Sequence, residues 1–349
     1  MWLRVMTREF TRSAVVLLAM TLGSFSVSGQ ELESAKDPGQ SRTVTVALDG
    51  SGQYKSIQDA IDEAKPCDTI HIQPGEYPED VTIHSKDRLR LIGAGVEKVT
   101  VLGRERVGVF HIGKWPYGAT HIEISGLTIR EHGGHAMGIF NGKSIVLHDV
   151  RINGMLFGQQ VQDVHIENCT IGGSETTGVQ FADSQAVLIG NLIHDNDHGV
   201  TVAGKSSIRL ERNVITRNLF EGVLVTDHAT AALVSNTITK NGGGVAFLNM
   251  ASGEASGNVI GLNQVGFLIA PSSHPMLSYN AVHNSEHNYV RAGSPPTAAP
   301  ELQSQTDLVT EPQFVDSGRD DFRLKPNSRL MHVGKFAYLG ALPPVETTR

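Results

Sequence analysis

Apolar residues alternate with polar ones in short runs through the middle of this chain, and the runs recur about every 22 residues. Residues 208–210 (IRL) and 223–225 (VLV) are typical examples. Each run is rich in leucine or β-branched residues and is bounded by turn-forming residues, which predicts a β-strand. No helix-spaced pattern occurs from about residue 70 to the end. We therefore expect an all-β chain.

One asparagine per repeat marks the period. The six asparagines are separated by 23, 22, 23, 22 and 22 residues: Asn168, Asn191, Asn213, Asn236, Asn258 and Asn280. A repeat of this length without helical periodicity predicts a single-domain parallel β-solenoid, in which each repeat forms one coil. Because coils stack at about 4.8 Å, equivalent asparagines would form a ladder of side-chain amide hydrogen bonds. We expect Asp149 and Gly126 to continue that column into the preceding coils.

Two further columns follow the same period. The second is Asn196, Asn218, Asn241 and Asn263, continued by Ser285, and the third is Gly178, Gly199, Gly222, Gly244 and Gly266. The glycines are expected at the bend into the next strand, where either a positive φ or the absence of Cβ is required.

The ends of a solenoid need covers, because the terminal coils would otherwise expose their cores. Residues 56–65 (SIQDAIDEAK) predict a short amphipathic helix, with Ser56 and Asp59 placed as a capping box. This helix should cover the first coil of a solenoid that spans residues 43–292. Residues 293–349 begin with a proline-rich loop and predict an irregular closing segment.

The first 29 residues resemble a secretory signal. Its parts are a basic start (Arg4, Arg8, Arg12), an apolar core at 14–22 and small residues at 27–29. We expect 1–29 to be removed, 30–42 to be a disordered lead-in, and the mature protein to be secreted or periplasmic. Since the apolar core is too short to cross a bilayer, the mature chain should have no integral membrane segment.

The net charge bears on the class of binding partner, and the cysteine positions bear on whether a disulfide forms. The net charge is −7, and it becomes −9 without the first 29 residues, which hold three arginines and one glutamate. An acidic protein is a poor partner for nucleic acid. The two cysteines, Cys67 and Cys169, should lie several coils apart, beyond the reach of a disulfide of about 7 Å between Cα atoms. The oligomeric state is left open.

The opening stretch VALDGSGQYKSIQDAIDEAKPCDTIHIQPGEYPEDVTI, followed by RLIGAG and VTVLG, resembles the first coils of pectin-lyase-like right-handed β-helix proteins, most of all pectin methylesterases. The N-x-I-x-x-N-x-x-G-V core resembles the carbohydrate-binding and sugar-hydrolase β-helix repeat, shared with NosD-like periplasmic proteins and alginate epimerases. EPQFVDSGRDDFRLKPNSRL resembles the closing module of secreted bacterial β-helix proteins. The resemblance implies a right-handed parallel β-helix that acts on carbohydrate.

The catalytic motifs of these families are missing. No GxVDFIFG strand or GRPW-like loop occurs, so methylesterase activity is not expected, and GMLFGQQVQDV from Gly154 only partly matches the preceding catalytic strand. The DPHD motif of alginate epimerases is also absent, and HDNDH at 194–198 is the nearest string. Polygalacturonase-like Asp patterns are not found either.

Aligning the coils brings charged and imidazole side chains into one turn region, within about 10–15 Å over three coils. The candidate catalytic residues are Asp197, His198, His194, Asp195, Glu175, Arg217, Glu221 and Lys240. A cation beside a uronate carboxylate, with a base to move a proton, would suit chemistry on an acidic sugar. The same charges could instead form ordinary exposed ion pairs.

Other residues could bind sugar or metal. The candidate substrate-binding residues are Trp115, Tyr117, His132 and His135. Phe157 and Phe220 either stack on sugar or pack under a loop, and His111, His121, His148 and His165 are interpreted as scaffold residues. Histidines and aspartates of 194–198 have donor atoms suited to a metal, but their directions are not fixed, so no metal is assigned. Ca²⁺ between carboxylates is conceivable, no aspartate cluster marks a site for it, and no cofactor is expected.

Three functions remain open. The first is an exported carbohydrate-active protein, namely a polysaccharide lyase, glycoside hydrolase or uronan epimerase acting on an acidic polysaccharide. The second is a non-catalytic module that binds glycan or protein. The third, more distant, is a NosD-like periplasmic accessory protein. Whether the chain is an enzyme is not decided by the sequence, because β-helices carry many different functions.

Overall fold

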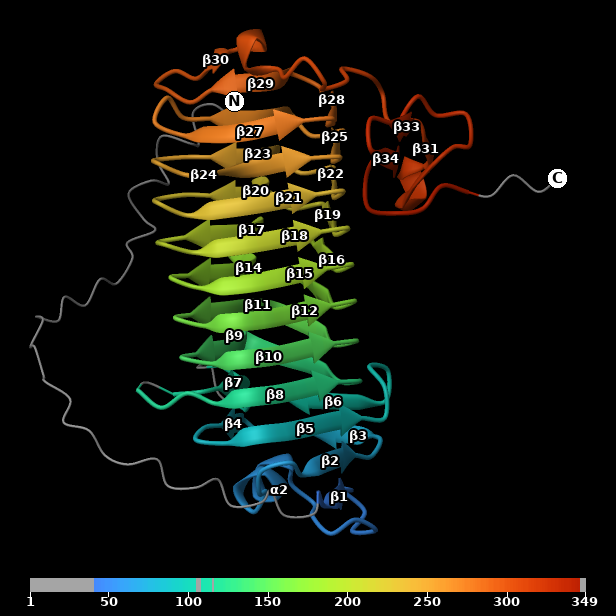
Figure 1. Ribbon diagram of the computed structural model, residues 1–349. Helices are drawn as coiled ribbons and strands as arrows, with labels where there is room; N and C mark the ends of the chain where they lie inside the picture. Colours follow the sequence, from blue (N-terminus) through green and yellow to red (C-terminus); the bar gives the residue numbers. More distant parts are fainter. Residues whose placement is uncertain (1–40, 105–107, 115, 346–349) are drawn as a thin grey trace, which may run out of the picture.

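The protein is a right-handed parallel β-helix whose coils stack along one axis (Figure 1). The computed structural model describes residues 41–104, 108–114 and 116–345, with the backbone alone for residues 132–134. The expected signal peptide and nearly all of the lead-in therefore lie outside the described residues, as does Trp115. No helix in the described part of the chain is long and apolar enough to cross a membrane.

Each coil supplies strands to three faces, which follow from runs of alternating apolar residues separated by tight corners. The first face is an 11-stranded sheet: β1 (Thr43–Val46), β2 (Thr69–Ile72), β5 (Asp87–Gly93), β8 (Thr120–Ser125), β10 (Lys143–His148), β12 (Gln162–Glu167), β15 (Gln185–Ile189), β18 (Ser207–Glu211), β21 (Thr230–Val234), β24 (Ser252–Ser256) and β27 (His274–Ser278). The second face has short strands: β3 (Gly75–Tyr77), β6 (Val99–Leu102), β13 (Thr170–Gly172), β16 (Leu192–His194), β19 (Val214–Thr216), β22 (Thr237–Thr239), β25 (Val259–Gly261) and β28 (Ala281–His283).

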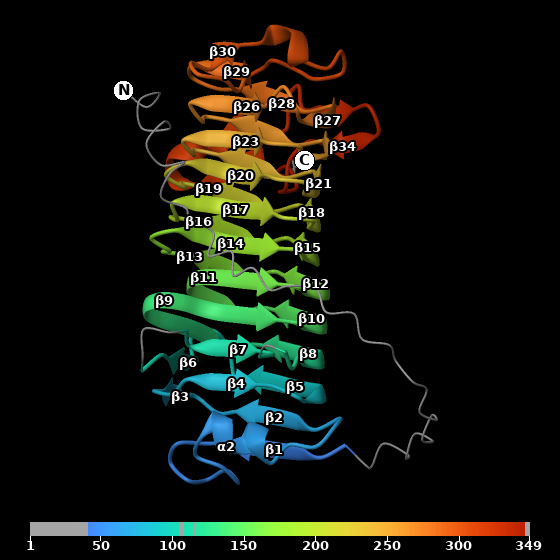
Figure 2. The ribbon, with the colours of Figure 1, turned by 90° about the vertical axis from the view of Figure 1, so that its left-hand side faces the viewer.

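The third face carries the candidate site and is turned toward the viewer in Figure 2. Its strands are β4 (Val81–Ile83), β7 (Phe110–Ile112), β14 (Thr177–Ala182), β17 (His198–Ala203), β20 (Glu221–Val225), β23 (Gly243–Phe247), β26 (Val265–Ile269) and β29 (His287–Arg291), joined by the later halves of β9 (Thr128–Phe140) and β11 (Arg151–Gln159). Neighbouring strands on all three faces pair in parallel, and apart from a register shift between β9 and β11 around Met155 the strands named for the third face stay in register, so equivalent side chains form columns along the axis.

A buried asparagine ladder runs along the corner between the first and second faces. Its members are Asn191, Asn213, Asn236, Asn258 and Asn280. From the second member on, each amide oxygen accepts bonds of 2.8–3.2 Å from the preceding member's backbone N–H and side-chain Nδ2. Asp307 ends the ladder by accepting from Asn280. The ladder confirms the amide column predicted from the repeat.

The predicted start of the ladder was wrong by one residue. Asn168, Asp149 and Gly126 lie at the preceding corner position with φ between 53° and 67°, a left-handed conformation that Gly, Asn and Asp tolerate. The ladder position in the coil of Asn168 is held by Cys169, whose backbone N–H donates to Asn191 Oδ1 at 2.9 Å. Cys67 and Cys169 are both free thiols, as expected from their separation.

The other two columns differ from expectation in detail. The second asparagine column continues to Asn284, which accepts from Asn263, and Ser285 is not part of it. In the glycine column the backbone has no positive φ; the requirement is space. A Cβ on Gly199 would lie 2.4 Å from the carbonyl oxygen of Gly222 in the next coil.

Both ends are covered. Helix α2 (Ile57–Asp62) closes the first coil, with Ser56 Oγ accepting from Asp59 N–H at 3.2 Å. Glu79 of the next coil also caps this end of the helix, because it accepts from the first two helical N–H groups, those of Ile57 and Gln58. At the other end the chain continues through β30 (Thr297–Ala298) and η2 (Pro300–Leu302).

A small closing module then packs beside the second face, to the right of the solenoid in Figure 1. It contains β31 (Phe314–Asp316), η3 (Ser317–Arg319), β32 (Asp321–Leu324), β33 (Met331–Val333) and β34 (Phe336–Tyr338). Its apolar side buries Phe322 and Leu339 against Val214 and Val259 of the solenoid. The irregular closing segment expected from the sequence is thus a docked module with its own small core.

Candidate functional site

Two outward-facing columns run side by side along the third face. One is Thr177, His198, Glu221, Gly243, Val265 and His287; the other is Phe157, Gln180, Thr201, Leu224, Ala246 and Leu268. The two residues between the columns in each coil face the core. Val200 is fully buried, and a Cβ on Gly199 would meet the buried Ile215 side chain, so the columns form the outer side of this face.

His198 and Glu221 form a pair on adjacent coils of this face. His198 Nδ1 lies 3.1 Å from Glu221 Oε2, and the exposed fractions of the two side chains are 29% and 5%. The contact is close enough for an ion pair but does not have hydrogen-bond geometry, because Nδ1 makes no hydrogen bond. The imidazole also stacks on Phe220, with ring centroids 5.1 Å apart. A carboxylate this buried is costly without a partner, and the His198 ring lies beside Glu221 in that position.

A cluster of aromatic and imidazole rings lies on the same face toward the N-terminal end. His135 stacks on Phe157 at 6.0 Å, Phe157 meets Phe140 edge-on at 5.8 Å, and Phe140 lies 5.9 Å from His111. Burial lowers the pKa of His111, and the nearby His135 lowers it further. Because a lowered pKa keeps it neutral at pH 7, His111 can both donate and accept hydrogen bonds there.

The cations of the predicted turn region are engaged in an ion-pair network. Arg217 binds Asp195 through two bonds of 2.9 Å and also binds Asp320 of the closing module. Lys240 Nζ donates to Asp320 at 2.7 Å, and His194 Nδ1 lies 2.6 Å from Asp195. The Arg217 guanidinium lowers the pKa of Asp195 to about 2. Arg217 and Lys240 therefore hold the closing module against the solenoid, and Asp195 and His194 contact Arg217.

The remaining predicted residues are spread out. Glu175 is exposed in the turn before β14, and Asp197 lies in the turn before β17. Tyr117 is 64% exposed in the loop after β7, close to the aromatic end of the third face. Trp115 and the side chain of His132 lie outside the described residues, while His135 is in the ring cluster. Of the twelve residues, the structure brings His198 and Glu221 together on the third face, and their roles stay predictions.

His111 is the residue that sequence reasoning misplaced. His121, His148 and His165 are scaffold residues as expected, since each lies on the first face beside an aspartate at 2.9–3.1 Å. His111 instead belongs to the ring cluster. The available signal was its position in β7, where register places it beside Gly138 and hence in the Phe157 column.

Within residues 41–104, 108–114 and 116–345, no three His, Cys, Asp or Glu side chains lie close enough together to hold a metal ion. Burial raises the pKa of the Cys169 thiol to about 12, so it is not a thiolate at neutral pH.

Comparison with known families gives two matches. A family described as periplasmic copper-binding protein (NosD) matches residues 120–298, about half of the chain. The pectinesterase family matches residues 43–126, which are the first coils. Together the two matches cover most of the solenoid.

Individual relatives agree with this division. A probable pectinesterase/pectinesterase inhibitor 23 of Arabidopsis thaliana is 27% identical over 190 residues, 47% of this chain and 33% of that protein. A pectinesterase of Petunia integrifolia is 43% identical over 68 residues, 18% of each chain. The match thus spans a third or less of these curated relatives. Among solved structures, pectate lyase Pel9A has a TM-score of 0.54 at 13% identity, covering 88% of this chain and 97% of that one, which shows the shared fold.

Proposed function

The chain belongs to the NosD family of β-helix proteins, and from that premise we propose that it is an exported polysaccharide-acting protein whose third face binds the sugar chain. The observation that carries the proposal is the alignment of the ring cluster with the His198–Glu221 pair on one surface. The pectinesterase relatives of the first coils support carbohydrate as the ligand class.

The ring cluster suits sugar binding. A pyranose ring presents C–H groups on its faces and hydroxyls around its edge. Phe140 and Phe157 offer partly exposed aromatic faces for the first, and the imidazoles of His111 and His135 offer hydrogen-bonding groups for the second. Two coils separate Phe157 from His198, roughly 10 Å at the spacing of stacked strands, so one or two sugar units would bridge them.

His198 and Glu221 suit proton transfer. The His198 imidazole is more accessible than Glu221, whose carboxylate lies within ion-pair distance of the ring, and imidazole is the side chain most often used for general acid–base chemistry. We assign His198 as the group that exchanges a proton with substrate and Glu221 as its positioning residue. Hydrolysis, elimination and epimerisation all need such a group, and the product distinguishes them.

The sequence prediction of an acidic polysaccharide relied on Arg217 and Lys240. Both cations are bound to carboxylates at the edge of the closing module. Strand segments 155–159, 177–182, 198–203, 221–225, 243–247 and 265–269 contain no lysine or arginine, and Arg291 of β29 is ion-paired with Glu301. These segments offer no lysine or arginine to a uronate carboxylate, which favours a neutral sugar.

Export rests on the signal-like first 29 residues. N-terminal sequencing of the secreted protein should find a start near residue 30. The copper named in the family description does not fit the described donor set, because copper sites need several soft or imidazole ligands together. The proposal therefore contains no step through a metal.

Binding to the third face can be tested with immobilised neutral polysaccharides and the mature protein. Phe157→Ala should weaken retention about tenfold, because it removes the central aromatic surface. The matched control is Phe336→Ala, which removes a phenylalanine ring at the contact between the closing module and the solenoid, away from the third face. Equal loss in both variants, or no retention of the wild type, would refute the third face as the sugar-binding surface.

A further inference from the structure

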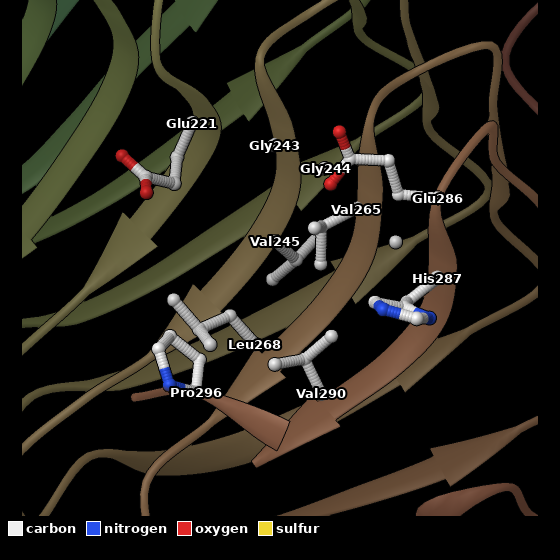
Figure 3. A pocket seen from close by; sticks show the side chains of 11 residues that line it. Glu221, Gly243, Gly244, Val245, Val265, Leu268, Glu286, His287, Val290 and Pro296 are labelled. Atoms are coloured by element: carbon white, nitrogen blue, oxygen red, sulfur yellow. The ribbon is translucent and has the colours of Figure 1, made fainter. Parts of the chain in front are cut away.

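A hollow lies on the third face directly after the His198–Glu221 pair. It measures about 600 Å³ including its open mouth, and it is lined by side chains of Val265, Leu268, Val290 and Pro296 (Figure 3). The backbones of Gly243, Gly244 and Gly266 form its floor. The hollow is thus aliphatic, unlike the ring cluster at the other end of the same face.

The hollow exists because Gly243 has no side chain. Its column neighbours are Glu221 and Val265, so a residue with a side chain would fill the space. The fold does not demand glycine there: a Cβ on Gly243 would meet its nearest atom, Glu221 Cγ, at 3.4 Å, which is ordinary contact. At the adjacent Gly244, by contrast, a Cβ would lie 2.5 Å from the carbonyl oxygen of Gly266.

Polar groups line the rim. Glu286 and His287, from the coil of β29, reach toward the hollow from one side in Figure 3. Glu221 stands at the other side and turns its carboxylate away from Val265, toward the coil of His198. The lining holds no phenylalanine, tyrosine, tryptophan, lysine or arginine. It therefore suits neither stacking of a bare sugar ring nor pairing with a uronate.

We infer that this hollow binds the short acyl group of an acetylated sugar unit, adjacent to the unit held at His198. The methyl group would contact Val265, Leu268 and Val290, while Glu286 and His287 would bond the hydroxyl or amide N–H groups of the same unit. The inference rests on the proposed glycan-binding function and specifies its substrate class. An acetyl ester and an acetamide present the same methyl carbonyl group.

The test uses mature protein and two pairs of oligosaccharides in titration calorimetry. O-acetylated xylo-oligosaccharides are compared with unacetylated ones, and N-acetylated chito-oligosaccharides with cello-oligosaccharides, which share the backbone but lack the acetamido group. Burying one methyl group favours the acetylated member of a pair by about fourfold or more. A preference in the xylo-oligosaccharide pair means that the hollow binds an acetyl ester, and a preference in the chito-oligosaccharide pair means that it binds an acetamido group.

Gly243→Ala and Gly243→Leu should reduce and then abolish the preference while leaving the unacetylated member bound as before. Ala203→Leu is the matched control, because it adds the same side chain to β17 on the same face away from the hollow. Equal binding of both members of each pair, or a preference that survives Gly243→Leu, would overturn the acyl site and leave the glycan-binding face intact. Absence of binding to all four oligosaccharides would overturn both.

Discussion

The most quantitative consequence of the fold concerns Asn236, at the centre of the buried ladder. Its Nδ2 donates to the Leu210 carbonyl at 2.9 Å and to Asn258 Oδ1 at 3.0 Å, and its Oδ1 accepts from Asn213 N and Nδ2 at 3.0 Å each. The side chain is fully buried. Asn236→Ala removes all four bonds and leaves the Asn213 N–H and the Leu210 carbonyl without these partners.

The expected loss of stability follows from the two backbone groups that lose a hydrogen-bond partner. A net hydrogen bond contributes about 0.5–1.5 kcal/mol, and each buried group left unsatisfied costs about 1–3 kcal/mol. Some relaxation is available because Asn258 Oδ1 still accepts the backbone N–H of residue 236 at 2.8 Å. We therefore expect Asn236→Ala to lower the free energy of unfolding by about 3–5 kcal/mol.

Equilibrium urea unfolding followed by circular dichroism measures this loss. Asn327→Ala is the control, since Asn327 is exposed in a loop of the closing module, and its effect should stay within about 0.5 kcal/mol. Hydrogen exchange of the coils around β19, β22 and β25 would show whether the destabilisation is local. A loss below about 1 kcal/mol for Asn236→Ala would refute the view that the ladder stabilises the stack.

Three further outcomes are expected. Asp195 has a folded-state pKa of about 2, below the unfolded value of about 3.9, so its pairing with Arg217 stabilises the fold above pH 4 and is lost as the pH falls toward 2. In Asp195→Asn the free energy of unfolding should therefore fall less steeply than in the wild type as the pH is lowered from about 4 to about 2. Burial raises the pKa of Asp307, so its ionisation destabilises the fold as the pH rises above about 4, and Asp307→Asn should flatten the pH dependence of urea midpoints there. Asp320→Asn should weaken docking of the closing module by about 1 kcal/mol, seen as faster limited proteolysis in the 303–313 connection. The control Asp321→Asn should leave proteolysis unchanged, because among the ion pairs described Asp321 pairs only with Arg323 in its own strand.

The sequence repeat predicted the architecture well because each coil packs between two similar coils. Equal spacing requires equal backbone paths, so the Asn191–Asn280 column and the glycine column could be located from period alone. The single-residue error at Asn168 arose because Asn suits two adjacent positions, the left-handed corner and the ladder. Nothing in the spacing separates those two roles.

The site was less predictable, since the turn charges were grouped without knowing their directions. Arg217 and Lys240 bind Asp320 of the closing module, which lies 80 residues beyond Lys240 in the chain, and Asp195 binds Arg217. His198 and Glu221, by contrast, start strands of the third face and meet because β17 and β20 pair in register. Docking of the closing module determines that Arg217 and Lys240 are paired with a carboxylate, and the local sequence pattern does not predict this long-range contact.

The central claim is that the third face handles a polysaccharide through His198 and Glu221. The most direct measurement is mass spectrometry of a panel of neutral, acetylated and acidic polysaccharides after incubation with mature protein in heavy water. Wild-type protein and the first-face control His165→Gln should yield the same product, marked by added water, an unsaturated end or deuterium at carbon. His198→Gln should lower its rate by about 10²–10⁴-fold, and Glu221→Gln should shift the pH profile. Full activity in His198→Gln, or no product from any polysaccharide, would contradict the account.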